Sequence, residues 1–396
     1  MTAVVIVALA IAAWIAIDLT LGRRQQRKLV AKKEAPLRKG DLVFYSEGND
    51  FFEDLFEDIE KARDHIHINF FIFRNDTIGK ETVARLKRKA AAGIKVRLLV
   101  DCIGSLSFPK KARKDLEKSG ISFAVSRKPT FPYWFYTLNH RNHRKITVID
   151  GKLGYVGGYN VGDEYLGKKP ELGDWRDYHL KITGDGTQDL QRQFLADWQE
   201  ATGDTVTGAS YYPKLDQGGV KFRLFATDGA FLEKRFLRMI RNAEKSVIIG
   251  SPYYIPGKKI QHALLSALKR GVSVKLLLPM KKDHPLVHEA AVPYFSPLLK
   301  AGCEIFLFYQ GFYHAKVMVI DEQVCDIGTA NLDKRSFTFN NEINCFIYDD
   351  DVMTTVLSAL DRDFRRSEKL TLDSLKSRSV RDRLREGTAT ALSPFL

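Results

Sequence analysis

The chain opens with its longest apolar run. Residues Ala3–Ile17 are uninterrupted apolar, and only Asp18 separates them from the stretch Leu19–Gly22. The run is about as long as the ~20 residues with which an α-helix crosses the hydrocarbon core of a bilayer. No charged side chain precedes it, in contrast to the basic start of a secretory signal peptide. We therefore predict a single transmembrane helix over residues 1–22, with a cleaved signal and a buried core helix as the alternatives.

A basic segment, residues 23–40, follows the apolar run. Because flanks rich in Lys and Arg stay in the cytoplasm, we expect the bulk of the protein on the cytoplasmic side of the membrane. The same charges attract anionic headgroups, at roughly 1 kcal/mol per charge near the surface. Glu34 is the only acidic residue of the segment, and its basic residues are Arg23, Arg24, Arg27, Lys28, Lys32, Lys33, Arg38 and Lys39.

The rest of the chain repeats one pattern of helix, glycine and strand. Each unit reads as the end of a helix, a glycine suited to the C-terminal cap, and a buried strand. Strands that alternate with helices of about ten to fifteen residues indicate βαβ units and α/β layers. Three stretches recur in order: Ile66–Phe73 matches Ser246–Tyr254, Ala91–Val100 matches Lys269–Leu278, and Lys118–Ile121 matches Lys300–Cys303.

These repeats predict two homologous α/β halves behind the anchor. The Gly- and Asp-rich stretch Asp204–Gly219 is the expected junction between them. We therefore place the first half at residues 41–215 and the second at residues 216–396.

A fourth repeat carries the candidate chemistry. In each half a His-x-Lys pair leads into an apolar strand that ends in Asp, and a Gly-x-x-Asn stretch follows. Because side chains at i and i+2 share a strand face, the imidazole and the ammonium of each motif project together. The two sets are His143, Lys145, Asp150 and Asn160 in the first half and His314, Lys316, Asp321 and Asn331 in the second, displaced throughout by 171 positions.

Two such sets fit the chemistry of a phosphodiester. The ammonium groups supply positive charge to the non-bridging oxygens, and the amides of Asn160 and Asn331 supply donors without adding charge. Such a cradle stabilises the extra charge of the transition state at phosphorus. One imidazole can attack phosphorus, while the other protonates the leaving alkoxide. We expect no metal or other cofactor, because Lys and Asn take the place of a Lewis acid.

A shorter pattern, His65-x-His67, also places two imidazoles on one strand face. We interpret it as an exposed polar face rather than a metal pair, since an isolated pattern of this kind carries little information. The complete motif at matched positions in two halves is far harder to obtain by chance.

The composition of the chain indicates which class of partner the protein binds and in which kind of compartment it works. The chain has 396 residues, and 62 Lys and Arg against 48 Asp and Glu give a formal charge of +14. This excess favours a polyanion, either nucleic acid or an anionic membrane, and the apolar run favours the membrane. The 4 cysteines include no Cys-x-x-Cys pair, which argues against a disulfide scaffold or structural zinc and for a reducing compartment.

The paired His-x-Lys-x4-Asp motifs with their Gly-x-x-Asn tails resemble the phospholipase D superfamily, and within it the bacterial cardiolipin synthases. The resemblance spans Gly40–Leu396 and departs from the family at two points. One N-terminal hydrophobic segment stands where many relatives carry two, and Asn341 stands where an aromatic residue is usual. The supporting stretches are Asn139–Lys145, Gly157–Tyr165, Trp175–Asp177 and Gly328–Phe337.

The resemblance implies two phospholipase D-like halves packed with one active site between them. It makes His143 the nucleophile, which forms a phosphatidyl-histidine, and His314 the general acid and base. The motif aspartates are expected to hold the turn after each strand rather than to react. The implied site comprises His143, Lys145, Asp150, His314, Lys316 and Asp321, with Asn160 and Asn331 on the phosphate, Glu342 orienting the first imidazole and Asp177 the second.

The implied reaction transfers a phosphatidyl group between two phosphatidylglycerol molecules, at the cell membrane of a bacterium, giving cardiolipin and glycerol. Phosphatidylglycerol and anionic lipids are then the partners, and no nucleic acid is expected. Two alternatives remain open: a membrane-anchored phospholipase D or other phosphodiesterase, including a nuclease, that uses water or another alcohol, and a non-catalytic lipid-binding scaffold. The aromatic stretches Phe131–Tyr136 and Val292–Phe295 are expected either at the membrane interface or in the core.

Overall fold

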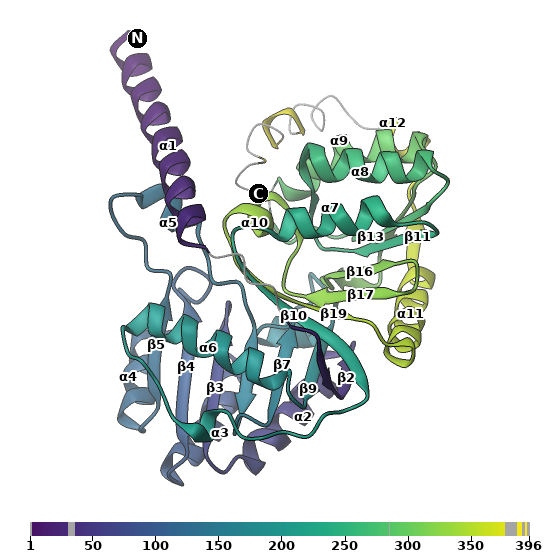
Figure 1. The fold of residues 1–396 in the computed structure, drawn as a ribbon. Helices are drawn as coiled ribbons and strands as arrows, with labels where there is room; N and C mark the ends of the chain where they lie inside the picture. Colours follow the sequence, from purple (N-terminus) through teal and green to yellow (C-terminus); the bar gives the residue numbers. More distant parts are fainter. Residues whose placement is uncertain (1, 31–35, 285, 377–385, 390–392, 394–396) are drawn as a thin grey trace.

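The computed structural model describes residues 2–30, 36–284, 286–376, 386–389 and 393. It begins with α1 (Thr2–Leu29), which projects from the rest of the protein (Figure 1). Within these residues α1 is the one helix that is long and apolar enough to cross a membrane, with a mean hydropathy of 2.5 in its most apolar window. The helix continues past Gly22 to Leu29, and part of the basic segment, including Lys32 and Lys33, lies outside the described residues.

The first half is built on one mixed sheet. Its described strands lie in the order β2-β9-β7-β6-β3-β4-β5. The parallel strands β3, β4 and β5 are joined by helices, and the antiparallel hairpin β6-β7 extends the sheet. Its elements are β2 (Leu42–Tyr45), α2 (Gly48–Lys61), β3 (His65–Phe70), α3 (Thr77–Ala91), β4 (Lys95–Asp101), α4 (Lys110–Lys118), β5 (Ser122–Ser126), α5 (Trp134–Asn139), β6 (Ile146–Ile149), β7 (Leu153–Gly157), η1 (Asp163–Leu166), β8 (Asp174–Arg176), β9 (His179–Thr183), α6 (Thr187–Thr202) and η2 (Ala209–Tyr211).

The second half repeats this sheet and adds a strand at each edge. The described order is β1-β10-β19-β17-β16-β11-β13-β14-β20. The edge strand β1 comes from the basic segment and pairs with β10. The elements are β1 (Arg38–Gly40), β10 (Val220–Asp228), α7 (Leu232–Asn242), β11 (Ser246–Gly250), β12 (Tyr254–Ile255), α8 (Gly257–Lys269), β13 (Ser273–Pro279), α9 (Val287–Lys300), β14 (Glu304–Phe308), β15 (Gly311–Tyr313), β16 (Val317–Ile320), β17 (Val324–Gly328), β18 (Leu332–Asp333), α10 (Lys334–Thr338), β19 (Asn341–Ile347), α11 (Asp350–Arg365), β20 (Ser367–Lys369) and α12 (Leu372–Lys376).

The glycines of the repeats end their helices as predicted. Gly93, Gly120, Gly271 and Gly302 have φ of +86°, +81°, +89° and +93°, which places them in the left-handed region. Glycine adopts this conformation at little cost, so it stops the helix and turns the chain into the next strand.

Helices cover both faces of each sheet, and a hydrophobic core joins the halves. Helices α2, α3 and α4 pack on one face of the first sheet, and α7, α8 and α9 on one face of the second. The other faces meet in a shared core to which α6 and α11 contribute, for example through Phe194, Trp198, Val356 and Leu360. The two halves are therefore one packed body, with their interface buried from water.

The prediction of an exposed face at His65 and His67 is wrong. Both side chains are fully buried and lie against α6, where Nε2 of His65 is 3.3 Å from Oε1 of Gln191 and Nδ1 of His67 is 2.9 Å from Nε2 of Gln191. A helix partner that supplies hydrogen bonds makes burial of the imidazoles possible, and strand periodicity does not reveal that partner.

Candidate active site

The two motifs border one cavity of about 710 Å³, lined by residues from both halves. His143 and His314 each reach its surface with 7% of their area exposed. Asn160 and Asn331 line the same cavity. The symmetry seen in the sequence is thus realised in space, because equivalent residues of the two repeats meet at one place.

The imidazole of His143 is held by a carboxylate from the other half. Its Nδ1 lies 2.9 Å from Oε2 of Glu342, at the start of β19. Glu342 is itself fixed by hydroxyl donors from Thr329 (2.6 Å) and Ser336 (2.8 Å) and by the amide of Asn340 (3.2 Å). A carboxylate only accepts at neutral pH, so Nδ1 carries the proton and Nε2 keeps its lone pair.

The imidazole of His314 is held in the same way from the first half. Its Nδ1 lies 2.5 Å from Oδ2 of Asp177, which follows β8 directly. The other carboxylate oxygen accepts from the backbone N–H of Tyr178 at 2.8 Å. Gly158 gives Asp177 its room, because a Cβ at this position would lie 1.9 Å from the carboxylate oxygen Oδ1. The equivalent position in the second half is Thr329, whose hydroxyl instead binds Glu342.

Backbone pairing fixes this exchange of partners between the halves. The N–H of His143 donates to the carbonyl of Asn341 at 3.0 Å, and the N–H of His314 donates to the carbonyl of Arg176 at 2.7 Å. Asn341 and Arg176 directly precede the carboxylate residues Glu342 and Asp177. In the second case the contact continues the parallel pairing of β15 with β8. Each histidine is therefore tied to the other half by both its backbone and its ring.

Burial makes both imidazoles poor bases. It lowers the pKa of His143 to about 4, although the Glu342 carboxylate opposes the effect. Burial and the Lys316 ammonium lower the pKa of His314 to about 3, against the opposing charge of Asp177. Both rings are neutral at pH 7 before a substrate enters. An anionic phosphodiester in the cavity raises both pKa values by its charge.

The two lysines are buried close behind the histidines. Nζ of Lys145 donates to the carbonyl of His143 at 2.9 Å, and Nζ of Lys316 lies 3.1 Å from Nε2 of His314 and 3.6 Å from the Asp177 carboxylate. Burial and the Lys316 ammonium lower the pKa of Lys145 to about 7. Burial lowers the pKa of Lys316 to about 8, with Asp177 opposing. The two ammonium groups thus act on one another across the interface.

Asp150 and Asp321 lie at the far end of the motif strands from the histidines. The carboxylate of Asp150 accepts the backbone N–H groups of Arg63, Asp64 and His65 at 2.9, 2.7 and 3.0 Å. Asp321 accepts those of residues 244–246 at 2.9, 2.7 and 2.8 Å. Both residues have a positive φ, near +54°. These contacts favour the expected role in holding the turn and the neighbouring strand start.

A buried polar cluster behind His143 was missed by sequence reasoning. Arg144 is completely buried, and its guanidinium donates to Asp197 and Asp228, each at 2.5 Å, and to the carbonyl of Glu342 at 3.2 Å. The amide of Asn142 also donates to Asp197 at 3.2 Å. Arg144 lies in the sequence between the motif residue His143 and a buried strand. A charge buried there is costly unless it is paired, so the position of Arg144 in the sequence already indicated that acidic partners were needed.

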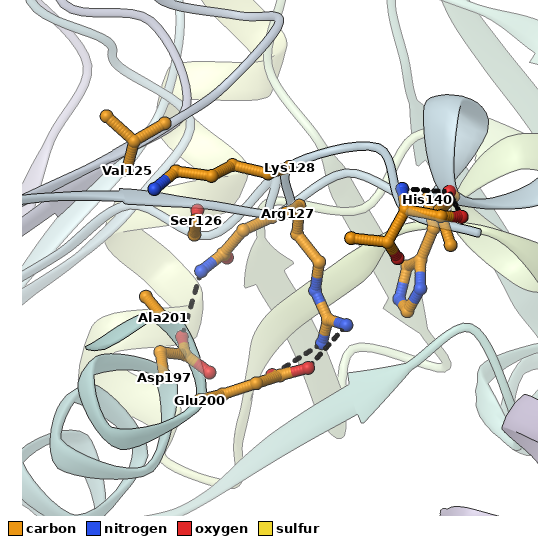
Figure 2. Close-up of a pocket in the computed structure, with 11 residues that line it drawn as sticks. Val125, Ser126, Arg127, Lys128, His140, Asp197, Glu200 and Ala201 are labelled. Carbon is orange, nitrogen blue, oxygen red and sulfur yellow. Dashed lines mark hydrogen bonds and ion pairs between the residues drawn. The ribbon is translucent and has the colours of Figure 1, made fainter. Parts of the chain in front are cut away.

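A smaller cavity of about 320 Å³ borders this cluster (Figure 2). Arg127 lies there opposite Glu200, with Nη1 to Oε1 at 2.6 Å. The unusual Asn341 contacts the same region: its side-chain amide is 2.7 Å from Nε2 of His140. With the amide nitrogen turned toward His140, its oxygen accepts from Arg127 at 2.6 Å. A polar residue at position 341 is therefore matched by polar neighbours.

A family model described as "Cardiolipin synthase, PLD-like domain" matches residues 55–198 and 236–366 of this chain. The chain belongs to this family. The minor cardiolipin synthase ClsB of Bacillus subtilis is 43% identical over 384 residues, which cover 97% of this chain and 96% of that protein. Cardiolipin synthase 2 of Staphylococcus epidermidis is 40% identical over 366 residues, which cover 90% of this chain and 74% of that protein.

Solved structures agree in fold. The phosphatidylserine synthase of Haemophilus influenzae superposes with a TM-score of 0.71 at 15% identity, over 94% of this chain and 100% of that one. A polyphosphate kinase from Porphyromonas gingivalis gives a TM-score of 0.58 at 14% identity, over 89% of this chain and 53% of that one. The predictions of the family, of two phospholipase D-like α/β halves and of a phosphatidyltransferase enzyme are confirmed.

Proposed function

We propose that this protein is a cardiolipin synthase that transfers a phosphatidyl group from one phosphatidylglycerol to another, through a phosphatidyl-histidine. The observation that carries the proposal is the pair of imidazoles on one cavity, each held by a carboxylate of the opposite half. The relatives named cardiolipin synthase, which align with nearly the whole chain, support the choice of lipid.

In the first step Nε2 of His143 attacks the phosphorus of the donor lipid. The proton on Nδ1 rests against Glu342, so the Nε2 lone pair is free to form the P–N bond. The low pKa of His143 keeps the ring neutral and nucleophilic at pH 7. The negative charge of the bound phosphate raises the pKa of His314, so this ring binds a proton together with the donor lipid and enters the step as the imidazolium. The bond from phosphorus to the oxygen of the headgroup glycerol breaks, and that oxygen takes the Nε2 proton of His314.

In the second step His314 takes a proton back. The terminal hydroxyl of a second phosphatidylglycerol gives its proton to His314 and attacks phosphorus, while the P–N bond to His143 breaks. Cardiolipin and free His143 result, so the two displacements balance without any other reactant. Asp177 stabilises the imidazolium form of His314 whenever it exists, as the carboxylate does in a Ser-His-Asp triad.

Lys145 and Lys316 neutralise the extra charge that develops on the phosphate oxygens, with the amides of Asn160 and Asn331 as neutral donors. Because the side chains of Lys145 and Lys316 are buried, their charges act more strongly than they would in water. We expect chelators to leave the activity unchanged.

We further propose that α1 spans the bacterial cell membrane and that the catalytic halves face the cytoplasm. The basic residues at the end of α1, such as Arg27 and Lys28, support this orientation. A reporter fused after Leu396 should be active only when it is of the kind that works in the cytoplasm. Activity of a reporter that works only outside would overturn the topology.

The decisive experiment uses purified protein and labelled phosphatidylglycerol as the only lipid. We expect labelled cardiolipin and released glycerol in equal amounts, and no product from His143→Ala or His314→Ala. The two single variants and the double variant should be equally inactive, since residues that act as a unit are not additive. Phosphatidic acid as the main product would instead indicate a phospholipase that uses water.

A further inference from the structure

The segment Phe131–Leu138, which contains α5, exposes large apolar side chains to the surroundings. Phe131 is 77% exposed, and Trp134 and Leu138 are each 37% exposed. The rings of Phe131 and Trp134 stack with their centroids 5.4 Å apart. No charged residue occurs from Phe131 to Asn139. The second aromatic stretch differs, because Val292 and Phe295 are packed in the core of the second half.

Helix α5 lies against the end of α1 that is nearest the catalytic halves (Figure 1). The rings of Trp14 and Phe135 meet edge to face with centroids 5.0 Å apart. The carboxylate of Asp18 is buried and accepts the backbone N–H of Tyr136 at 2.8 Å. The ring of Tyr136 covers Gly22 so closely that a Cβ there would lie 2.5 Å from it.

These contacts set the height of α5 relative to a membrane around α1. At 1.5 Å per residue, Trp14 is about 13.5 Å, Asp18 about 7.5 Å and Gly22 about 1.5 Å before Arg23, the first basic residue. The contacts of α5 with Gly22 and Asp18 therefore lie at the boundary between the hydrocarbon core and the headgroups, where Trp and Tyr gather in membrane proteins, whereas the contact with Trp14 reaches into the core. The single acidic residue of the apolar run thus has its hydrogen-bond partner in α5 rather than in lipid.

We propose that Phe131, Trp134 and Leu138 insert into the interfacial layer of the bilayer beside α1, as a second membrane contact. The occupant of this apolar surface is lipid, because the surface continues the exposed apolar side of α1, where Ile17 and Leu21 are 57% and 43% exposed. Uncharged aromatic residues with nearby cations such as Lys128 are typical of segments that lie in the interface plane.

The second contact would hold the catalytic cavity at the membrane surface. Helix α5 ends at Asn139, four positions before His143, and the Arg335 guanidinium from the second half donates to the Asn139 side chain at 3.1 Å. One helix alone lets a domain rotate and tilt, whereas two contacts fix its orientation. The inference rests on the proposed membrane span of α1.

The test places a polarity-sensitive dye on Phe131→Cys of the full chain in vesicles of phosphatidylcholine and phosphatidylglycerol. The background carries Cys102→Ser, since the other cysteines are buried. The matched control is Ala84→Cys, which is exposed on α3, at the opposite end of the protein from α1 (Figure 1). We expect quenchers on the lipid chains to act several-fold more strongly on the dye at position 131 than at position 84, and aqueous iodide to show the reverse.

Flotation of the vesicles separates this inference from the proposed anchor. If the chain floats with the vesicles but iodide reaches both dyes equally, the second contact is refuted while the anchor stands. If the chain does not float, both are refuted. In a second measurement, Phe131→Ser combined with Trp134→Ser should lower turnover in vesicles several-fold relative to turnover in detergent micelles. An unchanged ratio of the two turnovers would contradict the inference.

Discussion

Replacing Lys145 by methionine removes a buried charge while keeping the length of the side chain. Lys145 is fully buried, its Nζ donates to the carbonyl of His143 at 2.9 Å, and no carboxylate of the described residues pairs with it. Burial and Lys316 hold the pKa of Lys145 near 7. We expect Lys145→Met to abolish the activity and yet to make the protein more stable.

The size of the gain follows from the pKa of Lys145. Folding moves it from the ordinary value of 10.5 to about 7, and a tenfold change in proton affinity is worth ~1.4 kcal/mol. At pH 7 the burial of the Lys145 ammonium therefore lowers the free energy of unfolding by about 4 kcal/mol. The variant also loses one hydrogen bond, worth ~1 kcal/mol. The net gain of about 3 kcal/mol lies within the ~1–4 kcal/mol found when buried ions are replaced by apolar groups.

The gain should also depend on pH in a defined direction. Between pH 7 and pH 10.5 the unfolded wild-type chain still binds the Lys145 proton, whereas the folded chain has released it. The free energy of unfolding of the wild type therefore rises with pH in this window. Methionine does not titrate, so the advantage of the variant is largest below pH 7 and shrinks toward pH 10.

The assay is thermal unfolding of the full chain in detergent micelles, followed at about pH 6 and about pH 9. Lys316→Met is the matched control, because Lys316 lies 3.6 Å from Asp177 and its charge lowers the pKa of that carboxyl. Removal of the Lys316 ammonium leaves the negative charge of Asp177 less well compensated, so no gain in stability is expected for this variant. The reasoning would be refuted if Lys145→Met unfolded at a lower temperature than the wild type, or if its gain in stability grew with pH.

Three further predictions concern the reaction. Gly158→Ala should lower kcat at least about tenfold, because the added Cβ would displace Asp177 from His314. The control is Gly219→Ala, which should leave the rate unchanged because a Cβ at this position meets nothing within 4 Å. The kcat/KM value should fall above pH 7 as Lys145 loses its proton. The kcat value should fall only at higher pH, since bound phosphate favours the ammonium form of Lys145. A decline of kcat/KM and kcat at the same pH would contradict this prediction. A substrate chiral at phosphorus should give retention of configuration, as two in-line displacements require, and inversion would exclude the phosphatidyl-histidine.

The sequence predicted the parts that local pattern determines. The displacement of 171 positions reappears in the bounds of β6 and β16 and of β7 and β17. Periodicity and glycine placement suffice for this, because each repeat folds by its own short-range rules. The resemblance also named Glu342 and Asp177, whose carboxylates lie within hydrogen-bond distance of the two imidazoles, while their role in orienting the rings stays a prediction.

Tertiary contacts account for what the sequence did not reveal. Strand β1 joins the sheet of the second half, although residues 38–40 precede the first half in the chain. The two aromatic stretches have similar composition, yet Phe131 is exposed and Phe295 is buried. The burial of His67 depends on Gln191, which lies far from it in the sequence. Each outcome depends on a partner that no local pattern specifies.

The exchange of partners across the interface also explains why the two halves occur in one chain. Isolated, the first half would keep His143 but lose Glu342, and the second half would keep His314 but lose Asp177. Each imidazole would then lack the carboxylate that fixes its tautomer, and the hydrophobic core shared by the halves would be exposed to water. Folding and catalysis therefore depend on the same interface. A mutation that loosens this interface is expected to reduce the stability of the protein and the rates of both proposed displacement steps together, whereas a change in one outer helix layer is expected to affect stability alone.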